Sequence, residues 1–120
     1  MLRISTGVDC EPIEKFRRLM QTGEHRRIFS PTEYAYGLAA AAPAETYAGI
    51  WCAKEATVKA VSLLVSLDAR SVVVEHDDRN RPFVRIVGDN VKTGQLTVSI
   101  SHTPELALAV ALCWEDGSTK

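Results

Sequence analysis

Residues 51–60 read WCAKEATVKA, and together with residues 7–13, GVDCEPI, they carry most of what the sequence says about the fold. On a helix, Glu55 and Lys59 are four residues apart and share a face, so a carboxylate and an ammonium stand side by side. We expect one long helix around them, over residues 44–64. Its apolar residues run nearly all round, which predicts the central, buried helix of the protein.

Acidic residues upstream in the chain could form a binding site together with this helix. Asp9 and Glu11 follow a short apolar run, residues 4–8, which reads as a strand with the acids at its C-terminal end. If these acids meet Glu55 in space, the carboxylates form an oxygen-rich pocket for a hard divalent cation, with Lys59 beside a metal-bound phosphate. The spacing alone leaves a simpler alternative open, an ordinary surface ion pair between Glu55 and Lys59.

The other elements follow from helix signals in the first half of the chain and strand signals in the second. Pro12 suits the first turn of a helix, and Ser30-Pro31-Thr32-Glu33 is a capping box that opens a second helix through about Ala41. Pro43 separates that helix from the central one. After residue 68 the pattern changes to β-branched and alternating runs. The expected strands cover residues 71–76, 82–87, 96–101 and 106–114.

The last of these runs, residues 106–114, is ambiguous. Its alanine and leucine content favours a helix by propensity. Its position after a hairpin-like turn and its apolar alternation favour a strand, and a strand is our prediction. The chain shows no internal repeat or low-complexity linker. We therefore expect a single compact α+β domain over residues 1–120, with the long central helix packed on a mainly antiparallel sheet.

Composition narrows the functional classes. A chain of 120 residues is short for an enzyme with a deep cleft of its own, so a site shared between subunits is expected. The net charge of −1 gives no global attraction to nucleic acid or to an anionic membrane. No segment has the length of a signal peptide or a membrane span, which predicts a cytoplasmic protein. Cys10, Cys52 and Cys113 lack metal-ligand spacing and read as small core residues with inert thiols.

The two opening motifs together resemble the signatures of the phosphopantetheinyl transferases, an Asp after an apolar-Gly-apolar run and an aromatic-x-x-Lys-Glu-x-x-x-Lys helix. The resemblance continues through Asn80-Arg81-Pro82 and Ser99-Ile100-Ser101-His102, and the chain length resembles the short holo-acyl-carrier-protein synthase branch. It implies the phosphopantetheinyl transferase fold and Mg²⁺-dependent transfer of the 4′-phosphopantetheine arm of coenzyme A to a serine of an acyl or peptidyl carrier protein. The alternative is a catalytically silent member that binds carrier proteins or scaffolds a biosynthetic complex.

The resemblance assigns roles to the acids and the lysine. Asp9 and Glu55 match the metal-binding positions of the family, and Glu11 matches a third acid of the longer, surfactin-type branch. Glu11 is alternatively a charge that interacts with the N-terminus of the helix starting near Pro12. Lys59 matches the lysine that contacts the phosphate or helps to deprotonate the serine. Glu55 and Lys59 are therefore the expected catalytic residues.

The resemblance also places the coenzyme. Arg81 and His102 match positions of the nucleotide-binding region, with Lys59 as a further contact. The simpler interpretations are a solvated arginine in a turn and a structural histidine at a strand end. Lys54 points about a hundred degrees away from Glu55 on the helix, so we expect it on the surface.

Partner binding is expected at the first helix. Lys15 matches a basic family position, and with Arg18 it belongs to a basic cluster that would dock an acidic carrier-protein helix. The alternative is a solvated helix face. The short branch forms trimers with the active site between neighbouring subunits, so the resemblance implies a homotrimer. The cluster consists of Lys15, Arg17, Arg18, Arg26 and Arg27.

The sequence departs from the short branch in two places. Ile50 stands where these synthases usually have an arginine, which removes a phosphate clamp. Residues 61–66, VSLLVS, replace a glycine-rich loop and so remove a close backbone approach. Both changes predict altered contacts to coenzyme A or lower affinity for it. Trp51 and Glu11 resemble the surfactin-type branch instead, which suggests a short enzyme with mixed features.

Overall fold

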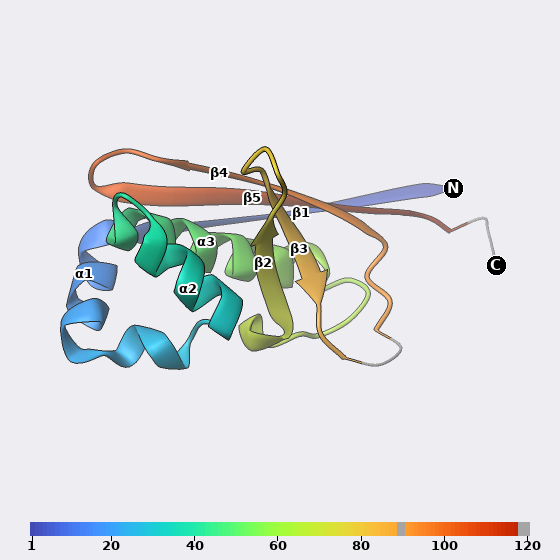
Figure 1. The fold of residues 1–120 in the computed structure, drawn as a ribbon. Helices are drawn as coiled ribbons and strands as arrows, with labels where there is room; N and C mark the ends of the chain where they lie inside the picture. The colour runs from blue at the N-terminus through green and yellow to red at the C-terminus, as the bar shows by residue number, and fades with distance from the viewer. Residues whose placement is uncertain (89–90, 118–120) are drawn as a thin grey trace.

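The computed structural model describes residues 1–88 and 91–117. Figure 1 shows α3 lying along a long three-stranded sheet, with α1 and α2 on the same side of that sheet and a separate β2–β3 hairpin beside them. None of the helices in these two ranges has the length and apolar character needed to cross a membrane. The elements in chain order are β1 (Leu2–Pro12), α1 (Ile13–Thr22), η1 (Glu24–Arg27), α2 (Pro31–Ala39), α3 (Pro43–Ala60), η2 (Ala69–Ser71), β2 (Val72–His76), β3 (Pro82–Ile86), β4 (Gln95–His102) and β5 (Leu106–Asp116).

The main sheet has the order β1-β5-β4, and both pairs are antiparallel. β1 and β5 pair along their whole length, from Leu2 opposite Asp116 to Pro12 opposite Leu106. Side chains alternate across a strand, and the small ones of β5 form its buried face, so α3 can lie close to the sheet. The strand prediction for this segment is therefore confirmed against its helix propensity. The buried β5 residues are Ala107, Ala109, Ala111 and Cys113.

Gly7 brings β1 into direct contact with α3. A Cβ atom at this position would lie 2.0 Å from the carbonyl oxygen of Ala56 and 2.8 Å from the backbone nitrogen of Ala60. Only glycine allows the two backbones to come this close. Asp9, two residues further along the strand, points to the same face of the sheet. The glycine of the GVDCEPI motif therefore sets the distance between Asp9 and α3.

The core forms around α3, which confirms that it is the central buried helix. Tyr47 is fully buried and stacks on Phe29 at a centroid distance of 4.9 Å, and its hydroxyl donates to the Tyr34 carbonyl at 2.6 Å. Ile50 is also buried, at 1% exposed. It therefore contributes packing where an arginine would reach outward. Trp51 packs edge-on against Phe29.

Two expected boundaries are wrong in ways that matter for the site. β1 continues to Pro12, so Asp9 and Glu11 lie within the strand and not after its end. The reason is that pairing with β5 continues three residues beyond Asp9. α3 ends at Ala60 and not near Leu64, because the chain then forms a tight turn in which the Leu64 N–H donates to the Val61 carbonyl.

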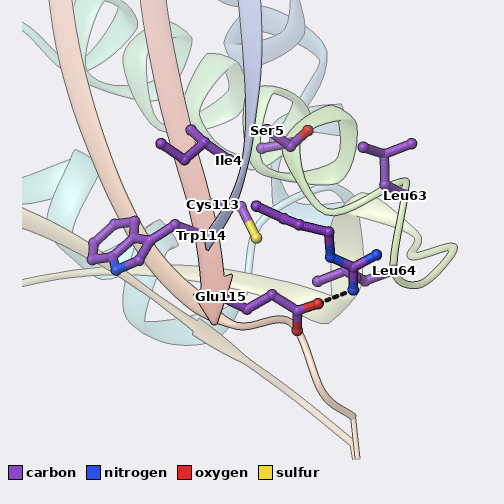
Figure 2. A pocket seen from close by; sticks show the side chains of 9 residues that line it. Ile4, Ser5, Leu63, Leu64, Cys113, Trp114 and Glu115 are labelled. Atoms are coloured by element: carbon purple, nitrogen blue, oxygen red, sulfur yellow. Dashed lines mark hydrogen bonds and ion pairs between the residues drawn. The ribbon is translucent and has the colours of Figure 1, made fainter. Parts of the chain in front are cut away.

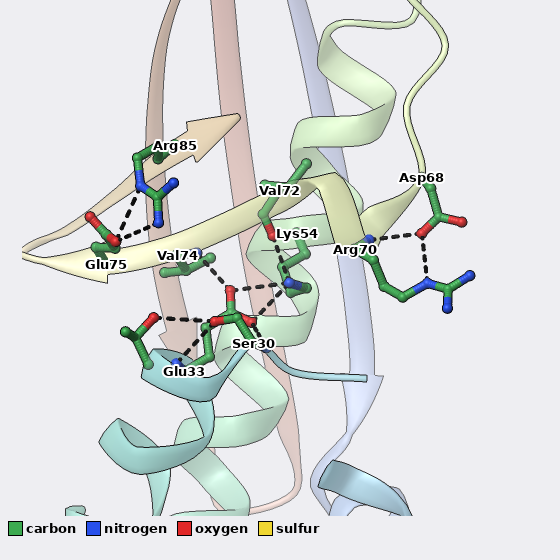
Figure 3. Close-up of polar contacts among 10 residues, drawn as sticks. Ser30, Glu33, Lys54, Asp68, Arg70, Val72, Val74, Glu75 and Arg85 are labelled. Carbon is green, nitrogen blue, oxygen red and sulfur yellow. Dashed lines mark hydrogen bonds and ion pairs between the residues drawn. The ribbon is translucent and has the colours of Figure 1, made fainter. Parts of the chain in front are cut away.

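The prediction that Lys54 lies on the surface is wrong, because its side chain is buried. Its side chain is 1% exposed, and its ammonium lies 2.9 Å from Glu33 Oε1 (Figure 3). Glu33 closes the predicted capping box at the start of α2 by accepting from the Ser30 N–H at 2.9 Å, which confirms that motif. The face of α3 that is turned away from Glu55 meets α2 and β2 instead of solvent.

Candidate active site

β1 and α3 bring Asp9 and Lys59 together. The Lys59 ammonium lies 3.4 Å from Asp9 Oδ1 and donates to the Val8 carbonyl at 2.8 Å. The Asp9 side chain is 15% exposed and that of Lys59 is 55% exposed. Among the described residues, Lys59 forms its ion pair with Asp9, so the simple pair between Glu55 and Lys59 is not the observed arrangement.

Glu55 lies close enough to these charges to be perturbed by them. Partial burial raises the pKa of its carboxyl most, and the Asp9 carboxylate raises it further. Lys59 acts in the opposite direction, while Glu11 adds a smaller increase. The structure thus gathers the three predicted acids and the lysine into one electrostatic cluster, on the buried face of β1 and the adjoining face of α3.

The cluster fits a divalent cation that keeps part of its own hydration. Asp9 Oδ2 is buried and meets the geometric criteria for a hydrogen bond with none of the described residues, although the Cys52 thiol lies near this carboxylate. A buried carboxylate oxygen in this state is costly unless a cation satisfies it. In the ranges 1–88 and 91–117, no group of three or more His, Cys, Asp or Glu side chains could hold a metal by itself. Mg²⁺ commonly takes only one or two protein carboxylates and completes its shell with water and phosphate oxygens. Asp9 and Glu55 suit that mode of binding.

Glu11 has a competing partner. Its two carboxylate oxygens each lie 3.3 Å from the Lys15 ammonium, one turn into α1. Glu11 therefore stands between the acidic cluster and the basic surface of α1. Both oxygens of Glu11 contact an ammonium, whereas Asp9 meets Lys59 through Oδ1.

The cysteines divide between the core and the surface. Burial is the main reason that the pKa of the Cys52 thiol rises to about 12, with smaller contributions from Asp9 and Glu11. Cys113 is also buried, and its pKa is raised mainly by burial. These two thiols stay protonated near neutral pH, as predicted. Cys10 was wrongly expected in the core; it is exposed because it faces outward on β1, between the two inward-facing acids.

His102 lies on β4, two strands away from the acids of β1, and Arg81 lies beside β4. Arg81 Nε lies 2.9 Å from Asp77 Oδ2 in the hairpin turn, and Arg81 lines a cavity of about 590 Å³ together with residues 97–100 of β4. His102 Nδ1 lies 3.2 Å from the Thr103 carbonyl and 3.7 Å from Glu45 Oε1. β4 and β1 are opposite edges of the sheet, with β5 between them. His102 and Glu11 nevertheless lie opposite the same residue, Ala107, so the register places them in one row across the sheet, two strands apart.

The loop that replaces the glycine-rich segment closes a small apolar cavity. Leu63 and Leu64 line it together with Ser5 and Cys113 of the buried face of the sheet, and the volume is only about 40 Å³ (Figure 2). An ion pair between Arg3 and Glu115 lies at its edge. A space of this size holds a few water molecules at most, so it is not a coenzyme site. The leucines cover the ends of β1 and β5 where a glycine-rich loop would leave backbone accessible.

The basic cluster lies on α1 and η1, but several of its charges have partners. Glu14 lies 3.2 Å from Arg17 and 3.8 Å from Arg18, and the Arg26 guanidinium lies 5.2 Å from the centre of the Tyr34 ring. Arg17 and Arg18 remain about half and three-quarters exposed, with side-chain values of 48% and 77%. This surface is accessible to a partner. It is equally consistent with the alternative interpretation, a solvated helix face.

Sequence reasoning missed two residues that shape the site. Gly7 was read only as part of a motif, although a glycine flanked by apolar residues before an acid is a signal of close backbone approach. Glu33 was read only as a helix cap. Its second oxygen accepts from the Val74 N–H at 2.6 Å, and no local pattern predicts that contact.

The fold and the candidate site together define a class of protein. In an α+β fold with antiparallel sheets, a helix with Glu55 and Lys59 packs against a strand with Asp9. Residues 5–113 match the 4′-phosphopantetheinyl transferase superfamily, and the chain belongs to it. Within that superfamily it falls in the holo-acyl-carrier-protein synthase branch. The holo-[acyl-carrier-protein] synthase of Moorella thermoacetica is 30% identical over 118 residues, which cover 91% of this chain and 92% of that protein.

Solved structures agree with this assignment. The coenzyme A complex of the Chronobacterium ammoniagenes enzyme superposes with a TM-score of 0.78 at 25% identity and covers 92% of this chain and 96% of its own. The acyl carrier protein synthase of Mycobacterium tuberculosis superposes with a TM-score of 0.70 at 30% identity, with the same two coverages. The predicted family and fold are confirmed.

Proposed function

We propose that this chain transfers the 4′-phosphopantetheine arm from coenzyme A to a serine of an acyl carrier protein, as a Mg²⁺-dependent holo-acyl-carrier-protein synthase acting in the cytoplasm. The observation that carries the proposal is the buried Oδ2 of Asp9, which has no hydrogen-bond partner among the described residues, together with Glu55, whose pKa the Asp9 carboxylate helps to raise. A bound cation would offset the repulsion between these two carboxylates. Residues 1–120 would act as a single domain.

The reaction breaks the phosphoanhydride bond of the coenzyme A pyrophosphate and forms a phosphodiester with the serine. The serine oxygen of the carrier attacks the phosphorus next to the pantetheine arm, and the bond to the adenosine 3′,5′-bisphosphate leaving group breaks while the serine loses its proton. Asp9 and Glu55 would hold Mg²⁺, which neutralises charge on the pyrophosphate. Lys59 is more than half exposed, so it can leave Asp9 and reach a phosphate oxygen. Glu11 would bind the same ion or one of its waters.

The nucleotide end of coenzyme A would meet Arg81 and His102 of a neighbouring copy. Support comes from their position toward the β4 edge of the sheet, whereas Asp9 lies on β1 at the other edge. A homotrimer with the site between subunits, as the family resemblance implies, would bring the two halves together. The outer face of the main sheet offers the surface for this contact. Its exposed apolar residues include Ile4, Val8, Leu106, Leu108 and Val110.

The departures from the short branch bear on affinity. Ile50 is buried and leaves no guanidinium at that position, and Leu63 and Leu64 cover the place of a glycine-rich loop. We expect weaker binding of coenzyme A than in synthases that keep both features. The mixed, surfactin-type character suggested by Trp51 and Glu11 stays a prediction.

One assay tests the function. Apo carrier protein incubated with this protein, coenzyme A and Mg²⁺ should gain the mass of the phosphopantetheine arm, and chelation of Mg²⁺ should prevent the gain. Carriers of fatty acid, polyketide and peptide synthesis should be compared, because the sequence does not indicate the pathway. No mass gain with any of them would favour the catalytically silent alternative.

A further inference from the structure

A fully buried ion pair lies next to the candidate site, and the proposed transfer does not use it. Lys54 is 1% exposed and Glu33 is 0% exposed, and the Lys54 ammonium lies 2.9 and 3.1 Å from the two Glu33 oxygens (Figure 3). Removing two charges from water is costly, so a buried pair often adds little net stability compared with apolar residues of similar size. The presence of this pair therefore calls for another explanation than stability.

The pair connects three elements. Besides Glu33 of α2, the Lys54 ammonium of α3 donates to the Val72 carbonyl of β2 at 2.6 Å. Glu33 accepts from the Val74 N–H of the same strand at 2.6 Å and from the Ser30 N–H at the start of α2. β2 is thereby held on both sides of Val73. The bonds are directional, so they fix orientation as well as proximity.

The hairpin is attached to the rest of the fold in two ways. β2 and β3 form a two-stranded sheet of their own, and β2 is held by the burial of Val72, Val73 and Val74 as well as by these bonds. At the tip, Tyr36 of α2 stacks on His76 at 3.8 Å and donates to Asn80. The base of the hairpin is fixed by Glu33 and Lys54. Arg81 follows directly after the residue held at the tip.

We propose that Glu33 and Lys54 are positioning residues that fix α3 and the hairpin of one chain relative to each other, so that each chain presents its acids to one shared site and its Arg81 to the next. The pair fixes the rotation of α3, which turns Glu55 toward Asp9, and it fixes the base of the hairpin that presents Arg81 to the nucleotide. The roles of Glu55 and Arg81 in this inference rest on the proposed function. The positions of α3 and the hairpin relative to each other are a property of the fold.

The test replaces both charges at once, so that neither partner is left buried alone. Glu33→Gln with Lys54→Met keeps the side-chain sizes similar. The matched control is Glu75→Gln with Arg85→Met, an exposed pair of 3.0 Å on the same hairpin (Figure 3). The measurements are thermal unfolding, the KM for coenzyme A, kcat, and hydrogen exchange of the β2 and β3 amides relative to those of α3.

We expect the buried double variant to fold and to unfold cooperatively, with a KM for coenzyme A raised at least about tenfold, because small misplacements of binding groups are costly. Its hairpin amides should exchange faster while the α3 amides keep their protection. The exposed control should stay within about twofold of the native protein, since such pairs contribute little.

Two results would overturn the proposal. One is a folded double variant whose KM and hairpin exchange match those of the control, which would make the pair a packing element only. The other is a double variant that does not fold, which would assign the pair to stability. If the native protein shows no transfer, the proposed function fails, but hydrogen exchange of the hairpin needs no substrate and still decides the positioning role.

Discussion

At Glu55 the charged form is disfavoured. Partial burial and then the Asp9 carboxylate raise its pKa above the ordinary value of 4.5, and Lys59 offsets this only in part. The folded protein therefore holds a proton on Glu55 in a pH range where the unfolded chain has already released it. In that range the folded state binds more protons, so the free energy of unfolding falls as pH rises through the raised pKa.

Glu55→Gln should remove this pH dependence and abolish transfer. Without Mg²⁺ at neutral pH, we expect the variant to unfold at the same or a higher temperature than the native protein, because a repelled charge is gone. Near pH 4 the gain should disappear, since native Glu55 is then protonated as well. Thermal unfolding across pH, together with the mass assay, measures both effects. Glu105→Gln, at an exposed turn residue, is the control, and a clear loss of stability in Glu55→Gln at pH 7 would contradict the argument.

Substitution of the two acids of β1 should reduce transfer to different extents. Asp9→Asn should abolish transfer, because it replaces a partly buried carboxylate with a neutral amide that binds a divalent cation far more weakly. Glu11→Gln should retain a measurable rate, because native Glu11 already has Lys15 as its partner at 3.3 Å. Transfer rates at rising Mg²⁺ concentration distinguish the two variants, since only the loss of a metal ligand should raise the Mg²⁺ concentration needed for transfer. An equal, complete loss in both variants would mean that the site needs three acids.

At the scale of elements, the contact between β1 and α3 decides whether the acids meet. Gly7→Ala would place a Cβ 2.0 Å from the Ala56 carbonyl oxygen, and neither backbone can yield easily. We expect a loss of at least about 2 kcal/mol in the free energy of unfolding, together with reduced transfer. Gly117→Ala is the matched control, because its Cβ would meet nothing closer than 3.5 Å. Denaturant unfolding of both variants checks this, and equal stability of the two would contradict the close approach.

The exposed face of α1 is the candidate docking element for the carrier. Arg17→Glu with Arg18→Glu tests it better than a change at Lys15, because Lys15 also contacts Glu11 and its reversal would disturb the acids. We expect a higher KM for the carrier at low salt that fades as the Debye length falls below about 8 Å. The KM for coenzyme A should stay constant. Arg70→Glu with Arg85→Glu, away from α1, is the control, and an unchanged carrier KM at low salt would make α1 a solvated face.

At the scale of the whole molecule, the outer face of the main sheet should be covered by another copy. Val110 is 44% exposed and Leu108 is 39% exposed in the middle of this face. Val110→Asp should therefore reduce the assembly to monomers and abolish transfer, because each site would lose Arg81 and His102 of its neighbour. Leu38→Asp, at an exposed leucine of α2, is the control. Light scattering should give about three times 13.2 kDa for the native protein; a monomer that still transfers would contradict the shared site.

The sequence alone determined the parts that depend on neighbours along the chain. The capping box before α2, the proline at the start of α3 and the alternation of β5 each follow from local geometry, and all three are confirmed. The resemblance carried by the two motifs predicted the family and the fold, and both are confirmed. Boundaries were less certain, as β1 shows, because pairing with a distant strand sets where it ends.

Only the tertiary structure decided what each charged side chain faces. Lys54 was expected in water, but Glu33, 21 residues away in the chain, supplies a counter-charge and β2 supplies a carbonyl acceptor. Helical spacing offered Glu55 as an ion-pair partner for Lys59, but Lys59 contacts Asp9, 50 residues away in the chain. Electrostatic partners are chosen by distance in space and by burial, and neither quantity is written in the spacing of a sequence.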